Sequence, residues 1–153
     1  MKALKQIFAL TILIFSMSTN LSGQDKKTVQ NPANAIIIPI HRIIFQLVSG
    51  DTLGHKQLMK QLNNIQSVAP GTQMEVVCHG PGLDMLVAEK STVADKIRKL
   101  TQSGVVFYAC EFSMTERKVE KKALISDAGL VPAGIIEIVK RQEQGWSYIK
   151  AGF

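Results

Sequence analysis

The feature of this sequence that most restricts its fold is an alternation of short apolar runs with longer segments of helical periodicity, from residue 41 onward. Residues 42–50 (RIIFQLVSG) are β-branched and aromatic, which is typical of a buried strand. Apolar residues then recur at helical spacing up to a Pro-Gly pair at residues 70–71, and Asp51 or Thr52 can cap that helix. Strand and helix alternating in this way predict an α/β fold, with a mostly parallel sheet covered on both faces.

The same pattern continues past the first helix. MEVVCHG (residues 74–80) is predicted as the second strand, followed by a short helix over residues 83–88 and another helix that opens at Ser91. VVFYAC (residues 105–110) is the predicted third strand. Ser113 and Glu116 have the spacing of a capping box, which predicts a helix that begins about three residues past Cys110 and runs through ERKVEKKAL.

Two further strands are expected near the C-terminus. Leu130-Val131 is a candidate short strand, and Pro132 suits the first turn of the helix that follows it. Residues 146–149 have the composition of a closing strand. The sheet should therefore have about five strands, and ligands are expected at the carboxyl ends of those strands.

The N-terminal residues have the layout of a secretory signal peptide. Two lysines precede an apolar run at residues 7–17 that is shorter than the roughly 20 residues of a membrane-spanning helix. We predict a signal peptide over residues 1–23 with cleavage after Gly23, a flexible leader over residues 24–39, and one domain over residues 40–153. The expected location is the periplasm or the extracellular space, and no later segment is apolar and long enough to span a membrane.

The charge balance does not indicate a nucleic-acid partner. The chain carries a formal net charge of +6, and removal of Lys2 and Lys5 with residues 1–23 lowers this value to +4. Its basic residues are interspersed with acids, as in EKSTVADKIRK, which is typical of solvated helix faces.

Cys110 and His79 are the candidate catalytic residues. Cys110 ends the third predicted strand beside a helix start, whose partial positive charge favours a thiolate, and we expect its sulfur to be open to solvent. Cys78 and His79 end the second strand, and His55 follows the first strand, so all four residues could gather at one rim of the sheet. His41 should lie at the opposite rim.

Structural alternatives apply to the same residues. Either cysteine could be a small buried residue, or the two could form a disulfide if the second and third strands are neighbours. His79 could be a hydrogen-bonded histidine at a strand end. His55, His79 and a cysteine are acceptable zinc ligands, but their spacing matches no metal motif.

No cofactor is predicted. Gly80-Pro81-Gly82 precedes a helix as a phosphate loop does, but Pro81 lacks the N–H that such a loop uses, and neither a dinucleotide fingerprint nor a P-loop lysine pattern is present. No Gly-x-Ser-x-Gly elbow supports a serine hydrolase.

The C-terminal half resembles a known family. SGVVFYACEFSM followed by GLVPAGIIEIVKRQEQGWSYIKAG is similar to the DsrE/DsrF-like family, which includes sulfur-relay proteins, and the likeness extends more weakly through RIIFQLVSG and EVVCHGPGLDML. This resemblance implies a three-layer α/β/α sandwich and a homo-oligomer (dimer, trimer or hexamer). In members that carry sulfur, a cysteine after the third strand bears the persulfide, and Cys110 in FYACEFS matches that position.

Two functions remain open from the sequence. The first is an exported thiol or persulfide sulfur carrier that uses Cys110, with His79 as a nearby acid or base and a sulfur donor or acceptor protein as partner. The second is a non-catalytic oligomeric binding or interaction module with structural or disulfide-bonded cysteines, in which His55, His79 and Met114 edge a pocket. The apolar C-terminal helix and WSYIKAGF favour self-association in both cases.

Overall fold

A five-stranded sheet forms the centre of the protein. A computed structural model describes residues 26–29 and 36–152, so the predicted signal peptide and its cleavage site after Gly23 lie outside the described residues. The strand order is β6-β5-β4-β3-β7, and every neighbouring pair is parallel. The strands are β3 (Arg42–Leu47), β4 (Gln73–Cys78), β5 (Val106–Cys110), β6 (Ala128–Val131) and β7 (Ser147–Ala151).

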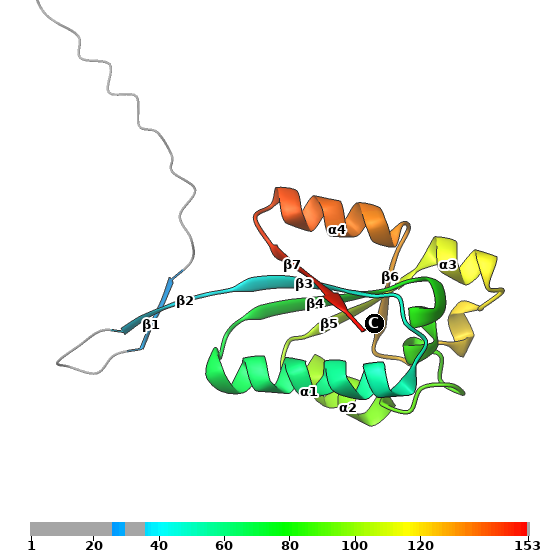
Figure 1. The fold of residues 1–153 in the computed structure, drawn as a ribbon, viewed down its shortest axis with the longest axis horizontal. Coiled ribbons are helices and arrows are strands. Elements are labelled where there is room, and N and C mark those ends of the chain that lie inside the picture. Colours follow the sequence, from blue (N-terminus) through cyan, green and yellow to red (C-terminus); the bar gives the residue numbers. More distant parts are fainter. Residues whose placement is uncertain (1–25, 30–35, 153) are drawn as a thin grey trace, which may run out of the picture.

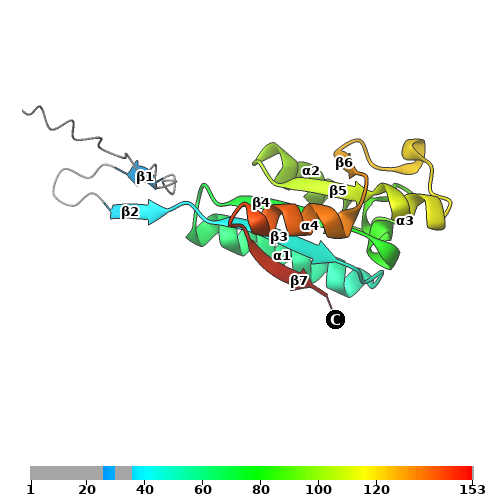
Figure 2. The ribbon, with the colours of Figure 1, turned by 90° about the horizontal axis from the view of Figure 1, so that it is seen from above.

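Helices cover both faces of this sheet (Figure 1). Helices α1 (Thr52–Val68) and α2 (Ala94–Gln102) lie on one face, and α4 (Gly134–Glu143) lies on the other. The short helix α3 (Glu111–Glu116) lies at the end of the sheet where β3, β4 and β5 finish (Figure 2). The predicted three-layer α/β/α sandwich with a parallel sheet of five strands is confirmed.

The core has two parts because side chains alternate across the strands. The larger part lies under α1 and α2, and its fully buried members include Phe45, Leu47, Cys78, Phe107 and Ala109. The smaller part lies under α4 and consists of Ile44, Val77, Val131 and Ile138. The two cysteines therefore point to different faces: Cys78 belongs to the larger cluster, and Cys110, one residue beyond Ala109, faces α4.

The predicted capping box is wrong. Helix α3 begins at Glu111 directly after Cys110, which is its N-cap residue, and Ser113 lies buried inside the helix. The Ser113 hydroxyl accepts a hydrogen bond from the Gly80 N–H at 2.8 Å instead of capping its own helix. This tertiary contact ties the segment after β4 to the segment after β5.

The helix predicted through ERKVEKKAL is also wrong. Helix α3 ends at Glu116, and Lys118 has a positive φ of 54°, a left-handed conformation that an α-helix does not contain. A single 3₁₀ turn, η2 (Lys121–Ala123), follows. Apart from this turn, the segment between α3 and β6 is a loop that returns to the sheet.

Smaller differences occur after β4 and near the N-terminus. The predicted helix at residues 83–88 is a 3₁₀ helix, η1 (Gly80–Leu86), and α2 begins at Ala94 rather than near Ser91. Within the segment predicted as a leader, β1 (Lys26–Val29) and β2 (Ile36–Pro39) form a separate antiparallel pair. Among the described residues, none of the helices combines the length and the apolar character needed to cross a bilayer.

Candidate functional site

Cys110 lies at the carboxyl end of β5, against the first residue of α4. The Gly134 N–H donates a hydrogen bond to the Cys110 Sγ at 3.2 Å. This N–H belongs to the first turn of a ten-residue helix, where backbone N–H groups have no partner within the helix and carry partial positive charge. The sulfur atom therefore accepts a hydrogen bond from one of the N–H groups that the start of α4 leaves without a helical partner.

Gly134 makes this approach sterically possible. A Cβ at this position would lie 2.9 Å from the Val77 Cγ1 and 3.5 Å from the Cys110 Sγ. Any larger residue would therefore push the start of α4 away from the sulfur. We regard Gly134 as part of the site, although it forms only a backbone contact.

The sulfur atom is covered. Cys110 has a relative exposure of 4 %, so the prediction that its sulfur is open to solvent is wrong. The cause is the close packing of the α4 N-terminus on the end of β5. A reagent or donor can reach the thiol only after part of this cover moves.

His79 lies next to Cys110 on the neighbouring strand. The β4–β5 register pairs Cys78 with Ala109, so His79 and Cys110 occupy the next position on the two strands. Both residues have extended backbone angles, which keeps the alternation of faces and places both side chains on the α4 side. Neighbouring strands lie about 4.8 Å apart, so the two residues are adjacent across the sheet.

The orientation of His79 is set by a polar chain that runs from β7 across β3 to the residue after β4. The Tyr148 hydroxyl donates to the Gln46 Oε1, and the Gln46 Nε2 lies 2.7 Å from the His79 Nε2. Because an amide nitrogen can only donate, the His79 Nε2 accepts and the ring proton lies on Nδ1. Burial lowers the pKa of His79 below its ordinary value, which agrees with a neutral ring.

Cys78 does not belong to this site. Its side chain is fully buried in the larger core cluster, and burial raises the pKa of its thiol far above the ordinary value. Both cysteines are reduced in the structure, and they face opposite sides of the sheet. The sequence left a disulfide open; this geometry does not support one, because the sheet itself separates the two sulfur atoms.

The structure does not bring together all the residues that were predicted to gather at one rim of the sheet. His55 is 1 % exposed on α1, beneath the opposite face of the sheet, and its Nε2 lies 2.9 Å from the Ser49 carbonyl oxygen. Met114 is buried in the larger cluster, so it does not edge a pocket with His79. In the part of the chain that the structure describes, no group of three or more histidine, cysteine or acidic side chains could hold a metal ion.

Sequence reasoning missed three residues of this site: Gln46, Gly134 and Tyr148. A glutamine inside the otherwise apolar strand RIIFQL is a signal for a polar partner on the same face. The Gly134 and Tyr148 contacts join residues that are 24 and 102 positions apart, which no local pattern can predict.

Comparison with known proteins identifies the family of this chain. The model of the DsrE/DsrF-like family matches residues 47–151, which include Cys110, His79, Gly134 and Tyr148. This chain belongs to the DsrE/DsrF-like family. Gln46 lies one residue before the matched range of this DsrE-like protein.

A solved structure supports the same assignment. The DsrE-like chain is similar to MTH1491, a protein of unknown function from Methanobacterium thermoautotrophicum, with a TM-score of 0.69 and 26 % sequence identity. The alignment covers 72 % of this chain and 98 % of that one. No curated protein matches this DsrE-like sequence.

Proposed function

We propose that this DsrE-like chain is an exported sulfur carrier in which Cys110 holds sulfane sulfur as a persulfide. The observation that carries the proposal is the hydrogen bond from the Gly134 N–H, at the start of α4, to the Cys110 Sγ. A helix N-terminus favours the thiolate, which is the nucleophilic form of cysteine. The sequence of residues 1–23 supports export.

The transfer step requires no external oxidant. The Cys110 thiolate attacks the terminal sulfur of a donor persulfide, R–S–SH, and forms Cys110–S–SH. The donor's S–S bond breaks, and the donor leaves as the thiolate R–S⁻. An acceptor thiolate reverses the sequence, so the proposed partners are a sulfur donor protein and a sulfur acceptor protein.

His79 would act as the acid of this reaction. Its ring is neutral, since burial lowers its pKa, and the Nδ1–H that the Gln46 contact leaves free can donate a proton to the leaving thiolate R–S⁻. The chain through Gln46 to Tyr148 holds the ring in place beside the thiol. Because Cys110 is covered, the N-terminal turn of α3 or α4 must shift when a donor docks.

Persulfide labelling tests this proposal. The protein, purified from its own cell envelope, is incubated with inorganic polysulfide, and its intact mass and labelled peptide are then measured. We expect one added sulfur atom on Cys110, no added sulfur in Cys110→Ser, and a chain that begins after residue 23.

Cys78→Ala provides the matched control. It removes the other thiol, which lies on the opposite face of the sheet, and should keep the added sulfur. Sulfur retained in Cys110→Ser, or a native chain that never takes sulfur while its unfolded form does, would refute the carrier role.

A second function is favoured by a different observation. Four large apolar side chains are exposed on α4 or beside its start: Phe112, Ile135, Ile136 and Val139, with exposures of 65 %, 52 %, 52 % and 41 %. Phe112 lies close to the start of α4, because its N–H donates a hydrogen bond to the Pro132 carbonyl oxygen just before that helix. We call these four residues the α4 patch. An exposed patch of this kind is typical of a protein interface.

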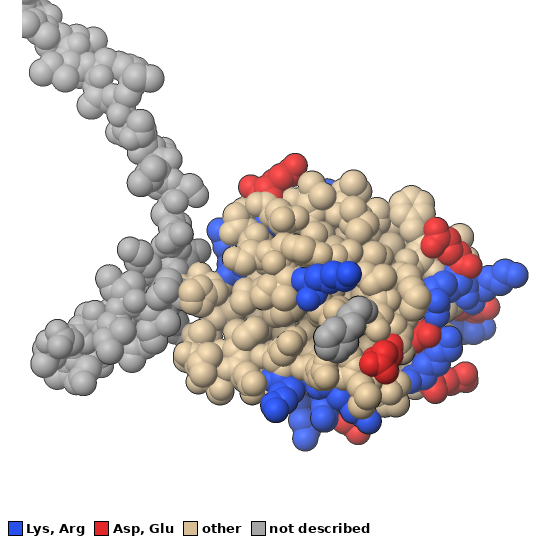
Figure 3. Space-filling model, viewed as in Figure 1, with Lys and Arg blue, Asp and Glu red and all other residues tan. Residues whose placement is uncertain are grey.

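The family resemblance implies a homo-oligomer, and we propose that a second copy of the chain covers the α4 patch. The nearby edge strand β7 exposes Tyr148, and the surface over β7 carries few charged side chains (Figure 3). Burial of both cysteines fits an oligomeric binding module in which neither thiol reacts. The labelling experiment separates this function from sulfur transport, because a module of this kind takes no sulfur.

Light scattering tests the interface. At micromolar concentration the wild-type chain should have the mass of an oligomer, and Ile136→Glu should have the mass of a monomer, because a carboxylate would be desolvated in the contact. Leu53→Glu is the matched control, since Leu53 is also exposed (63 %) and also lies in the first turn of its helix, α1. A monomeric wild type, or equal masses for both variants, would contradict the proposed interface.

A further inference from the structure

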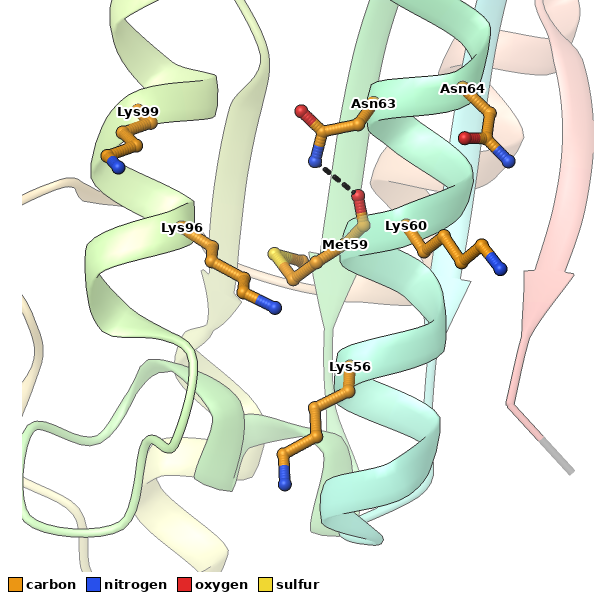
Figure 4. A pocket seen from close by; sticks show the side chains of 7 residues that line it. All are labelled: Lys56, Met59, Lys60, Asn63, Asn64, Lys96 and Lys99. Atoms are coloured by element: carbon orange, nitrogen blue, oxygen red, sulfur yellow. Dashed lines mark hydrogen bonds between the residues drawn. The ribbon is translucent and has the colours of Figure 1, made fainter.

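A groove between α1 and α2 is lined by four lysines. It has a volume of about 420 Å³ and lies on the face of the protein opposite to α4. Helix α1 contributes Lys56 and Lys60, and α2 contributes Lys96 and Lys99. The buried side chain of Met59 lies between the two helices, and Asn63 and Asn64 complete the lining (Figure 4).

These lysines have no acidic partners among the described residues. Several cations elsewhere on the surface do form ion pairs, as in Lys90–Asp84 and Lys122–Glu120. Asp95, the acid next to Lys96 on α2, pairs with Arg98 instead. The groove therefore concentrates positive charge that no acid of the described chain neutralises.

The spacing of the lysines adds to this excess. Lys56 and Lys60 are four positions apart on α1, and Lys96 and Lys99 are three positions apart on α2, so each pair shares one face of its helix. Like charges at these spacings destabilise a helix. A bound anion would remove the repulsion within both pairs at once.

The lining indicates which anion fits. The positive charges extend over about 6 Å along α1, so a chain of anionic groups contacts more of them than a single ion does. No aromatic side chain lines the groove, and a nucleic-acid strand would lack the stacking surface that its bases use. Lys96 points toward Met59 in Figure 4, whereas Lys60 and Lys99 point outward, and their flexible stems allow them to turn onto a ligand.

We propose that the groove between α1 and α2 binds a condensed phosphate chain, with Lys56 and Lys96 as its central contacts. The Asn63 amide donates to the Met59 carbonyl oxygen at 2.7 Å, which fixes its side chain at the wall of the groove. Binding depends on charge and falls steeply as salt concentration rises. This site is independent of Cys110, because it lies on the opposite face of the sheet.

Calorimetric titration of the full chain with tripolyphosphate at low salt tests the site. We expect saturable binding that is weakened about tenfold in the double variant Lys56→Gln/Lys96→Gln, since each exposed charge contact contributes modestly. Orthophosphate should bind more weakly than tripolyphosphate, and ATP should bind no more tightly, because its base finds no stacking partner.

The matched control is Lys121→Gln/Lys122→Gln. It lowers the net charge by the same amount, but its two lysines belong to η2 and do not line the groove. Binding that falls equally in both double variants would overturn the site in favour of general charge attraction. Tighter binding of a single-stranded oligonucleotide of equal charge would also overturn it, as would no binding of tripolyphosphate.

Discussion

Replacing Arg141 by alanine should lower the free energy of unfolding by about 3 kcal/mol or more, the largest loss that we expect from any exposed or half-buried side chain. The Arg141 Nε lies 2.7 Å from the Glu75 Oε2 and 3.1 Å from the Glu137 Oε1. Its guanidinium also lies over the Trp146 ring, 5.2 Å from the ring centre. One side chain on α4 therefore holds β4, its own helix and the segment before β7 together.

The loss is large because Glu75 would remain buried without a partner. Glu75 is 6 % exposed, and its burial raises its pKa more than Arg141 lowers it. Leaving an uncompensated charge in such a position costs far more than an ion pair gains on the surface. The alternative for the variant is to protonate Glu75.

This alternative makes the loss depend on pH. The pKa of Glu75 in the folded protein is above its unfolded value, so the folded state binds more protons and stability falls as pH rises through that window. Without Arg141 the pKa of Glu75 in the folded protein rises further, so stability falls with rising pH over a wider pH range. Urea unfolding at pH 5 and pH 7.5 should therefore show a larger deficit for Arg141→Ala at the higher pH.

Lys122→Ala is the matched control. Its ion pair with Glu120 has the same N–O distance, 2.7 Å, but both side chains are exposed. This variant should lose less than about 0.5 kcal/mol. Adding Glu75→Gln to Arg141→Ala should restore part of the stability, because it removes the buried charge. Equal losses of stability for Arg141→Ala and Lys122→Ala would show that the burial of Glu75 is not the cause of the loss.

The strands and the first helix could be predicted from local sequence because local interactions determine them. Asp51 caps α1 as expected, since its carboxylate accepts hydrogen bonds from the N–H groups of Leu53 and Gly54. The apolar runs that were read as strands became β3, β4 and β5, and the short runs near the C-terminus became β6 and β7. Each of these features depends on residues within a few positions of one another.

The details of the site could not be predicted because they depend on distant residues. Cys110 was placed correctly at the end of a strand, but its cover comes from Gly134 on another helix. Ser113 had the sequence of a capping residue, and a tertiary hydrogen bond to Gly80 took its hydroxyl. Glu75 lies within the predicted strand MEVVCHG, but nothing in the sequence identified it as a buried acid or Arg141 as its partner.

Replacing Gly82 by alanine should be as damaging as losing Arg141, because the new Cβ would meet backbone. It would lie 2.7 Å from the Leu47 carbonyl carbon, 3.0 Å from the Val48 nitrogen, and closer still to the Leu47 carbonyl oxygen. That oxygen accepts the His79 N–H at 3.1 Å, so relief of the clash breaks the contact that joins β3 to the residue after β4. Leu47 is fully buried and paired on both sides, so the strand cannot move away freely.

Gly54→Ala is the control for this substitution. The nearest atoms to a Cβ at Gly54 lie 3.8 Å away, and the residue is inside α1, where alanine is favoured over glycine by about 1 kcal/mol. We expect urea unfolding to show equal or greater stability for Gly54→Ala and a loss of about 3 kcal/mol or more for Gly82→Ala. Should Gly82→Ala fail to fold, its soluble yield beside that of Gly54→Ala gives the same comparison. A Gly82→Ala protein of wild-type stability would mean that the end of β3 yields to a methyl group, and the placement of His79 beside Cys110 would then lose its rigid support.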